Sequence, residues 1–113
     1  MPWPKVDGCQ DYQGVNWIHP LFQKRIARLI EHTKCNFPGV TFLIVFGSVT
    51  STRCTPDSDI DIVVGGDESG SFYEPPEDNT PYDVLWDKFI IKDEELLAEI
   101  VNDGVVVYGP IHA

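Results

Sequence analysis

The sequence predicts a small α/β (α+β) domain in which a sheet of about three to four strands is flanked by helices. Its length of 113 residues is that of one domain. We expect an irregular arm over residues 1–18 and one folded domain over residues 19–113. Three patterns indicate this fold class: apolar, β-branched runs at 40–46 and 59–64, an amphipathic stretch at 19–36, and a helix-then-strand pattern at 93–108.

The charge balance limits the partners of the chain. It holds 18 Asp and Glu against 8 Lys and Arg, for a net charge of −10. Proteins that grip long nucleic acid normally need a basic surface, so DNA or RNA binding is disfavoured. A small Mg²⁺-nucleotide or a basic protein partner fits better, although acidity can also serve solubility alone.

The cysteines and the hydropathy of the sequence indicate where in the cell the protein is expected. The 3 cysteines lack C-x-x-C spacing, which disfavours a disulfide scaffold or a zinc site and fits a reducing cytoplasm. The sequence shows no transmembrane stretch and no signal peptide, so we expect no membrane association and a cytoplasmic location.

The stretch at 19–36 predicts the first helix, with Pro20 in its first turn and the segment 37–39 ending it. Apolar spacing predicts these inward residues: Leu21, Phe22, Ile26, Leu29, Ile30 and Thr33. The solvent-facing side is predicted to hold Gln23, Lys24, Arg25, Arg28 and Glu31.

The second half predicts an exposed loop, a strand, a helix and a last strand. Residues 67–80 are rich in Gly, Pro, Ser and acids, as exposed loops are. In the strand at 81–86, Asp83 and Leu85 share one face, opposite Tyr82, Val84 and Trp86. A helix at 93–102 is predicted to turn Leu96, Leu97, Ile100 and Val101 inward, before a strand at 105–108.

Gly47-Ser48 ends the apolar strand at 40–46 and is a candidate phosphate site. Glycine lets a backbone approach a ligand closely, and Ser48 adds a hydroxyl and an N–H group. The same pair is common in ordinary turns. We expect a short helical segment and a turn over 49–57.

Asp59 and Asp61 flank Ile60 at the start of the next strand and point to one face. Two carboxylates so placed repel each other unless a cation lies between them, and hard oxygen ligands suit Mg²⁺ or Mn²⁺. A solvated strand edge is the alternative. An EF-hand is excluded because Ile62 stands where that loop needs glycine.

Together, Gly47-Ser48 and the run from Pro56 to Asp61 resemble the G-S…S-D-I-D signature of the DNA polymerase β-like nucleotidyltransferases. The chain is most similar to their minimal nucleotidyltransferase domains, over about residues 20–110. The resemblance implies a nucleotidyltransferase fold with a small mixed sheet. Residues 50–52 read Thr-Ser-Thr, where the family usually has a small residue, a basic residue and a glycine.

The resemblance also implies roles for particular residues. The carboxylates that would hold two Mg²⁺ ions (or Mn²⁺) are Asp59, Asp61 and Asp83, with Asp87 as the alternative third acid. The residues that would bind the nucleotide phosphates are Gly47, Ser48 and Ser58.

The implied reaction moves a nucleoside monophosphate from a nucleoside triphosphate, which we expect to be ATP, to an acceptor hydroxyl. By resemblance, the acceptor lies on a HEPN-domain protein whose antitoxin this chain would be. A different interpretation is an inactive nucleotidyltransferase-like protein that neutralises or scaffolds a partner by contact. A third is a plain α/β domain with incidental acids. The sequence leaves the oligomeric state open.

Overall fold

A computed structural model of the chain describes residues 2–66, 73–87 and 92–109. It confirms the predicted fold class, a mixed α/β domain. The helices are α1 (Gln23–Asn36) and α3 (Glu94–Asp103). The strands are β1 (Phe42–Phe46), β2 (Ile60–Gly65), β3 (Tyr82–Trp86) and β4 (Val105–Tyr108). Three short 3₁₀ segments are η1 (Val15–Trp17), η2 (Pro20–Phe22) and η3 (Gly47–Thr50).

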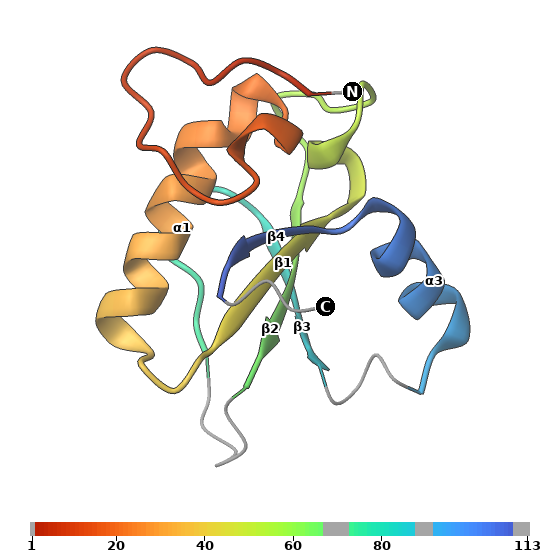
Figure 1. Ribbon diagram of the computed structural model, residues 1–113. Helices are drawn as coiled ribbons and strands as arrows, with labels where there is room; N and C mark the ends of the chain where they lie inside the picture. Colours follow the sequence, from red (N-terminus) through yellow and green to blue (C-terminus); the bar gives the residue numbers. More distant parts are fainter. Residues whose placement is uncertain (1, 67–72, 88–91, 110–113) are drawn as a thin grey trace.

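The four strands form one mixed sheet in the order β3-β2-β1-β4 (Figure 1). β1 pairs antiparallel with both β2 and β4, whereas β2 and β3 run parallel. The apolar run of β1 suits its position between two partners, since a strand covered on both faces needs no polar alternation. The first strand is shorter than predicted, because Val40 and Thr41 precede the paired residues.

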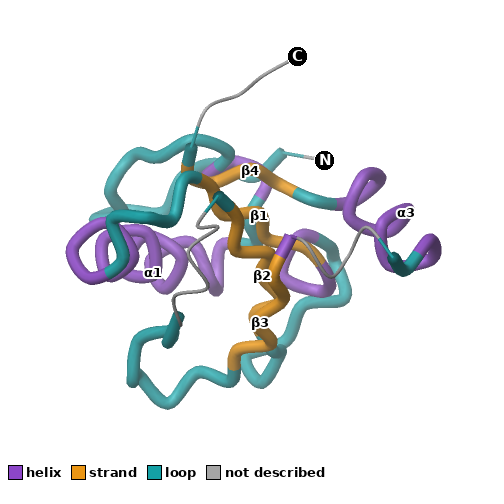
Figure 2. Tube along the Cα trace, turned by 90° about the horizontal axis from the view of Figure 1, so that it is seen from below, coloured by secondary structure: helices purple, strands orange, loops and turns teal. Residues whose placement is uncertain are grey.

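The two helices lie on opposite sides of the sheet (Figure 2). The larger hydrophobic core lies between α1 and the sheet. There, Ile26 and Leu29 pack with Leu43, Val45 and other fully buried side chains. A smaller cluster forms on the α3 side. Its buried members are Phe46, Val63 and Ile100, with Ile44, Leu85 and Leu96 around them. The alternation of β2 therefore gives each helix its own apolar face.

The first predicted helix has a different start. The 3₁₀ segment η2 comes first, and the α-helical bonding begins only at Gln23. His19 precedes η2, and its Nδ1 accepts a hydrogen bond from the Leu21 amide at 3.2 Å. This tighter turn rotates Leu21 outward to 50% exposure, so the prediction that it lies inward is wrong.

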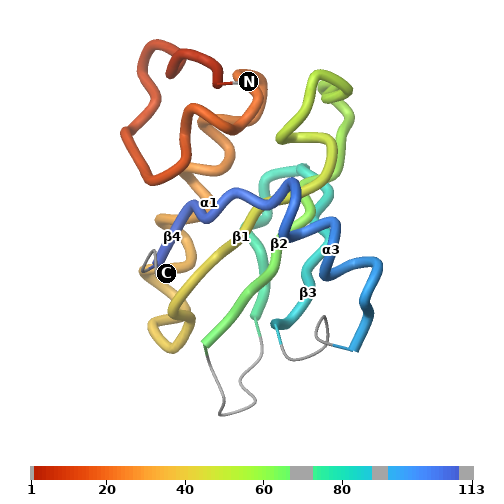
Figure 3. The backbone as a smooth tube through the Cα atoms, turned by 45° about the vertical axis from the view of Figure 1, so that its right-hand side comes forward, coloured from red at the N-terminus to blue at the C-terminus, as the bar shows by residue number. Residues whose placement is uncertain are grey.

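Gln23 was predicted to face solvent, and this is wrong because its side chain is fully buried. Its Oε1 accepts from the Val6 amide at 2.7 Å, and its Nε2 donates to the carbonyls of Pro4 and Ile18 at 3.0 and 3.1 Å. The Tyr12 hydroxyl bonds the Gln23 carbonyl at 2.9 Å. One amide thus anchors the N-terminal arm, which Figure 3 shows lying against the start of α1.

Replacing this amide is expected to loosen the arm. In Gln23→Leu, one buried and two partly buried backbone groups lose their partner, so the free energy of unfolding should fall by about 2–3 kcal/mol. Urea unfolding measures the loss, and limited proteolysis should cut within residues 2–14 sooner. Lys24→Ala, on the exposed side of the same turn, should change stability by less than about 0.5 kcal/mol. Equal stability of the two variants would contradict the anchoring role.

The second helix begins and ends one residue later than predicted. Asp93 caps it, its Oδ1 accepting from the Leu96 amide at 3.1 Å. Ile100 is buried as predicted, but Leu97 and Val101 are 36% and 75% exposed, so the predicted inward face is too wide. The helix contacts the sheet through a single row of side chains, Leu96 and Ile100, which pack on the central strands β1 and β2.

The connection between β2 and β3 is not uniformly exposed, contrary to the prediction for residues 67–80. Residues 67–72 lie outside the described part. Tyr73 is buried, packs its ring at a tilt against Phe37 with centroids 4.7 Å apart, and hydrogen-bonds the Thr33 hydroxyl at 2.8 Å. His32 Nε2 lies 2.8 Å from the Glu74 carbonyl. These contacts fasten the connection to the end of α1.

Two further expectations concern cysteines and membranes. All three cysteines are free thiols, with Cys9 buried and Cys35 exposed. Within residues 2–66, 73–87 and 92–109, neither helix has the length and apolarity needed to span a bilayer.

Candidate functional site

Gly47 opens the turn at the end of β1, and the turn requires glycine. Its φ is +84°, a conformation that side-chain-bearing residues rarely adopt. A Cβ built there would also overlap the Asp61 carboxylate, with Oδ2 as the nearest atom. The close approach follows from the register, since Phe46 and Asp61 are direct partners in β1 and β2. Gly47 therefore leaves room for a carboxylate beside the backbone.

Hydroxyl groups hold the turn after Gly47. Thr50 Oγ1 donates to the Gly47 carbonyl at 2.8 Å. The amide and hydroxyl of Ser51 both donate to the Ser48 carbonyl, at 3.0 and 3.1 Å, and the Arg53 amide donates to Ser51 Oγ. The Thr-Ser-Thr stretch that departs from the family pattern thus closes its own turn through side-chain-to-backbone bonds.

Asp61 and Asp83 lie side by side. They are direct partners in the parallel pair β2 and β3, so their side chains leave the same face of the sheet. This face is covered by α3, and Leu85 lies on it too. Tyr82, Val84 and Trp86 point to the other face and pack on the α1 side. The predicted alternation of this strand is confirmed. Asp59, two residues before Asp61, precedes β2 on the same face.

The electrostatics of Asp61 reflect this crowding. Its pKa is raised from the usual 3.8 to about 6. Burial is the largest cause, followed by the charges of Asp83, Asp59 and Glu99. Burial and like charges both disfavour the ionised form. All three predicted carboxylates therefore interact at one place, with Asp61 at its centre.

Glu99 of α3 is a fourth acid near the site, and it was missed in the sequence. Its charge contributes to the raised pKa of Asp61. The helical period carried a usable signal, because Glu99 lies next to Ile100 and three residues after Leu96, both of which pack on the sheet. An acid next to the row of helix residues that packs on the sheet lies at the border of that packing contact, where its charge acts on nearby groups of the sheet.

The donor chemistry of this face fits a hard divalent cation. Asp59 and Asp83 are exposed, Asp61 is half-buried, and carboxylate oxygens are what Mg²⁺ and Mn²⁺ bind. Across the described stretches, however, no three acidic, histidine or cysteine side chains are gathered closely enough to count as a complete metal site. The strands thus bring the donors to one face without fixing their carboxylates in a ligand cage.

The remaining predicted residues are placed as follows. Ser48 is half-buried in η3, immediately after Gly47. The Ser58 hydroxyl accepts from the Thr55 amide at 2.9 Å and closes the turn before Asp59. Asp87 follows the last residue of β3, at the opposite end of the strand from Asp83. Asp83 is therefore the better-placed third acid.

A mixed four-stranded sheet with a Gly-Ser turn against carboxylates on two adjacent strands is the arrangement of a nucleotidyltransferase-type domain. Comparison with family models agrees, because the model described as Polymerase beta, Nucleotidyltransferase matches residues 26–110. The chain belongs to this nucleotidyltransferase family, whose general activity is nucleotidyl transfer. Searches of curated proteins and of solved structures gave no match.

Proposed function

We propose that the chain transfers a nucleoside monophosphate from a nucleoside triphosphate, ATP in the first instance, to an acceptor hydroxyl. Family membership supports the reaction class. The observation that carries the proposal is the register pair of Asp61 and Asp83, with Gly47 against the Asp61 carboxylate. These contacts support the proposal because the backbone of the Gly-Ser turn lies directly beside carboxylates that can hold the counter-ions of a phosphate.

Each residue has a proposed task. Gly47 and Ser48 would hold the terminal phosphates. Ser58 would accept the Thr55 amide with its oxygen, keeping the turn before Asp59 in shape, and donate its hydroxyl hydrogen to the same phosphates. Asp59 and Asp61 would bind Mg²⁺ or Mn²⁺ together with Asp83. Asp83 would also lie toward the acceptor and take the proton of its hydroxyl.

The chain's own chemistry explains why a cation is needed. When bound, a pair of divalent ions stabilises the attacking and leaving oxygens of an in-line displacement. Without such a counter-charge, the negative charges around Asp61 would repel a triphosphate, just as they repel one another. ATP binding should therefore depend on the cation.

Calorimetry with ATP tests this proposal. Wild type should bind ATP in the presence of Mg²⁺ and not in the presence of EDTA. Asp59→Asn should weaken the Mg²⁺-dependent affinity at least about tenfold, the loss typical of disturbed metal sites. Glu77→Gln makes the same charge change at an exposed position outside the site and should bind as wild type does. Normal, Mg²⁺-dependent binding by Asp59→Asn would contradict the assignment.

For the acceptor, we propose a hydroxyl on a basic protein partner of the HEPN type, which would make the chain an antitoxin. The net charge of −10 supports a basic partner through electrostatic complementarity. Co-purification with a neighbouring-gene product, followed by mass spectrometry for an added AMP, tests this step separately from ATP binding.

A contact-only binding protein is the second candidate function. It is favoured by the Thr-Ser-Thr stretch at 50–52 and by the Ser58 hydroxyl, which already serves the Thr55 turn. It predicts no Mg²⁺-dependent ATP binding and an unchanged partner complex in Asp61→Asn. The transferase proposal predicts the opposite for the first of these measurements.

A further inference from the structure

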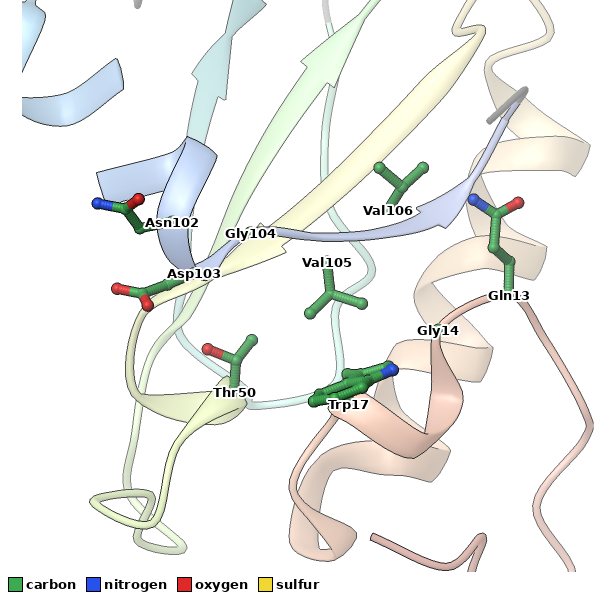
Figure 4. A pocket seen from close by; sticks show the side chains of 9 residues that line it. All are labelled: Gln13, Gly14, Trp17, Thr50, Asn102, Asp103, Gly104, Val105 and Val106. Carbon is green, nitrogen blue, oxygen red and sulfur yellow. The ribbon is translucent and has the colours of Figure 1, made fainter. Parts of the chain in front are cut away.

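One cavity is lined by none of the candidate-site carboxylates. Its volume is about 530 Å³, and it lies between η1, η3 and the junction of α3 with β4. Figure 4 shows Trp17 and Val105 toward one end and Asn102 and Asp103 at the α3 end, with Thr50 between them. The proposed reaction uses none of its lining residues.

The charged side chain on the described lining of this cavity is negative, and it is solvent-exposed. Among its described lining residues there is one acid, Asp103, and no lysine, arginine or histidine. The C-terminal end of α3 reaches the same rim and carries the negative end of the helix dipole. The charge at the cavity is thus negative, and the net charge of the whole chain, −10, has the same sign.

The opposite end of the cavity is apolar and aromatic. Trp17 is 49% exposed although it lines a cavity, and Val105 is only half-buried. An exposed indole attracts organic cations through its ring face and accepts aliphatic stems by contact. An apolar surface that leads to an acidic rim suits a ligand with an apolar stem and a charged head.

Two elements connect the cavity with the candidate site. Thr50 lines the cavity and bonds the Gly47 carbonyl at 2.8 Å. On α3, Asp103 lies one helical turn after Glu99, whose charge reaches Asp61. The sheet order places the cavity beside β4, on the far side of Gly47 from Asp83. A ligand there would lie next to the candidate site without occupying it.

We propose that this cavity binds an organic cation on an apolar stem, a guanidinium or ammonium group, with the stem on Trp17 and Val105 and the head at Asp103. Such a group is found on arginine side chains of a polypeptide and on free alkyl amines. The inference holds whether or not the chain transfers nucleotides, because none of the catalytic carboxylates takes part in it.

Chemical-shift titration of the ¹⁵N-labelled full chain tests the proposal. The probes are acetyl-Gly-Arg-Gly-amide, its neutral citrulline analogue, and agmatine, all at constant ionic strength. The arginine peptide and agmatine should shift the Trp17 indole and the amides of Asp103 and Val105, and the citrulline peptide should bind at least about threefold more weakly. Tighter binding of the peptide than of agmatine assigns the site to a polypeptide, and equal binding assigns it to free cations.

Matched variants localise the effect. Trp17→Leu and Asp103→Asn should each weaken binding about two- to fivefold. Leu21→Ala and Glu95→Gln remove an exposed apolar group and an acid outside the cavity, and both should bind as wild type does. The spectra themselves report whether each variant is folded. Equal binding of the citrulline peptide, or unchanged binding by both cavity variants, would overturn the proposal.

Discussion

Asp61→Asn is expected to abolish nucleotidyl transfer while it leaves the fold intact. Asp61 lies between Gly47 and Asp83, and loss of its charge would leave any bound cation with an incomplete set of carboxylates. Since loss of even an outer partner of a metal site costs 10–100-fold, we expect a drop of more than about a hundredfold. Incorporation of label from the α-phosphate of ATP into the acceptor measures it. Transfer at the wild-type rate would remove Asp61 from the mechanism.

The same variant should be more stable than wild type at neutral pH. The pKa of Asp61 is about 6 in the folded chain against 3.8 normally, so the folded state binds the proton more tightly. The contribution of Asp61 to stability is therefore favourable below about pH 4 and is lost as the pH rises toward 6. The shift corresponds to about 3 kcal/mol, which solvent screening at this half-exposed group reduces to about 1 kcal/mol.

Thermal unfolding as a function of pH checks this sign. Asp61→Asn should unfold about 4 °C above wild type at pH 7, with the difference vanishing near pH 4. Glu77→Gln, at an exposed site away from the cluster, should show no such pH-dependent difference. A lower unfolding temperature for Asp61→Asn at pH 7 would contradict the described crowding. These measurements are made without added Mg²⁺.

Gly47→Ala is expected to lose both stability and activity. The φ of +84° costs a side-chain-bearing residue about 1–2 kcal/mol. The new methyl group would also overlap the Asp61 carboxylate and force it to move. We expect a total loss of about 2–4 kcal/mol in urea unfolding, together with loss of Mg²⁺-dependent ATP binding.

Gly8→Ala separates these two effects. Gly8 has a similar φ of +80°, but a Cβ there would meet only the flexible end of Lys24, at 3.4 Å from Nζ. This variant should lose about 1 kcal/mol and bind ATP normally. If Gly47→Ala also lost only about 1 kcal/mol and bound ATP normally, the contact between the Gly47 turn and Asp61 would not be needed for ATP binding.

The parts of the fold that follow from short-range patterns were predictable from the sequence. Successive side chains of a strand point to opposite faces, so once residues 81–86 are predicted to be a strand, the common face of Asp83 and Leu85 follows. The neighbouring positions of Asp61 and Asp83 could not be derived from pattern. They depend on β2 and β3 pairing in parallel with those two residues in register, which is a tertiary property.

Several wrong predictions of burial share one cause, which is that residue type was used as a proxy for burial. Gln23 is polar but is fully buried because the N-terminal arm supplies partners for its amide. Val101 is apolar but exposed because only the row of Leu96 and Ile100 on α3 packs against the sheet. Tyr73 lies in a loop that is otherwise mostly polar, and its aromatic ring was the available signal of a contact such as the one with Thr33.

The position of β3 has a consequence for how the candidate site comes apart. Within the described sheet β3 pairs only with β2, whereas β2 is held on both sides. Fraying of this outer strand would carry Asp83 away while Asp61 stays in place. Amide hydrogen exchange should therefore be faster at Val84 than at Ile62, and half of the acidic site would be lost in openings far smaller than global unfolding.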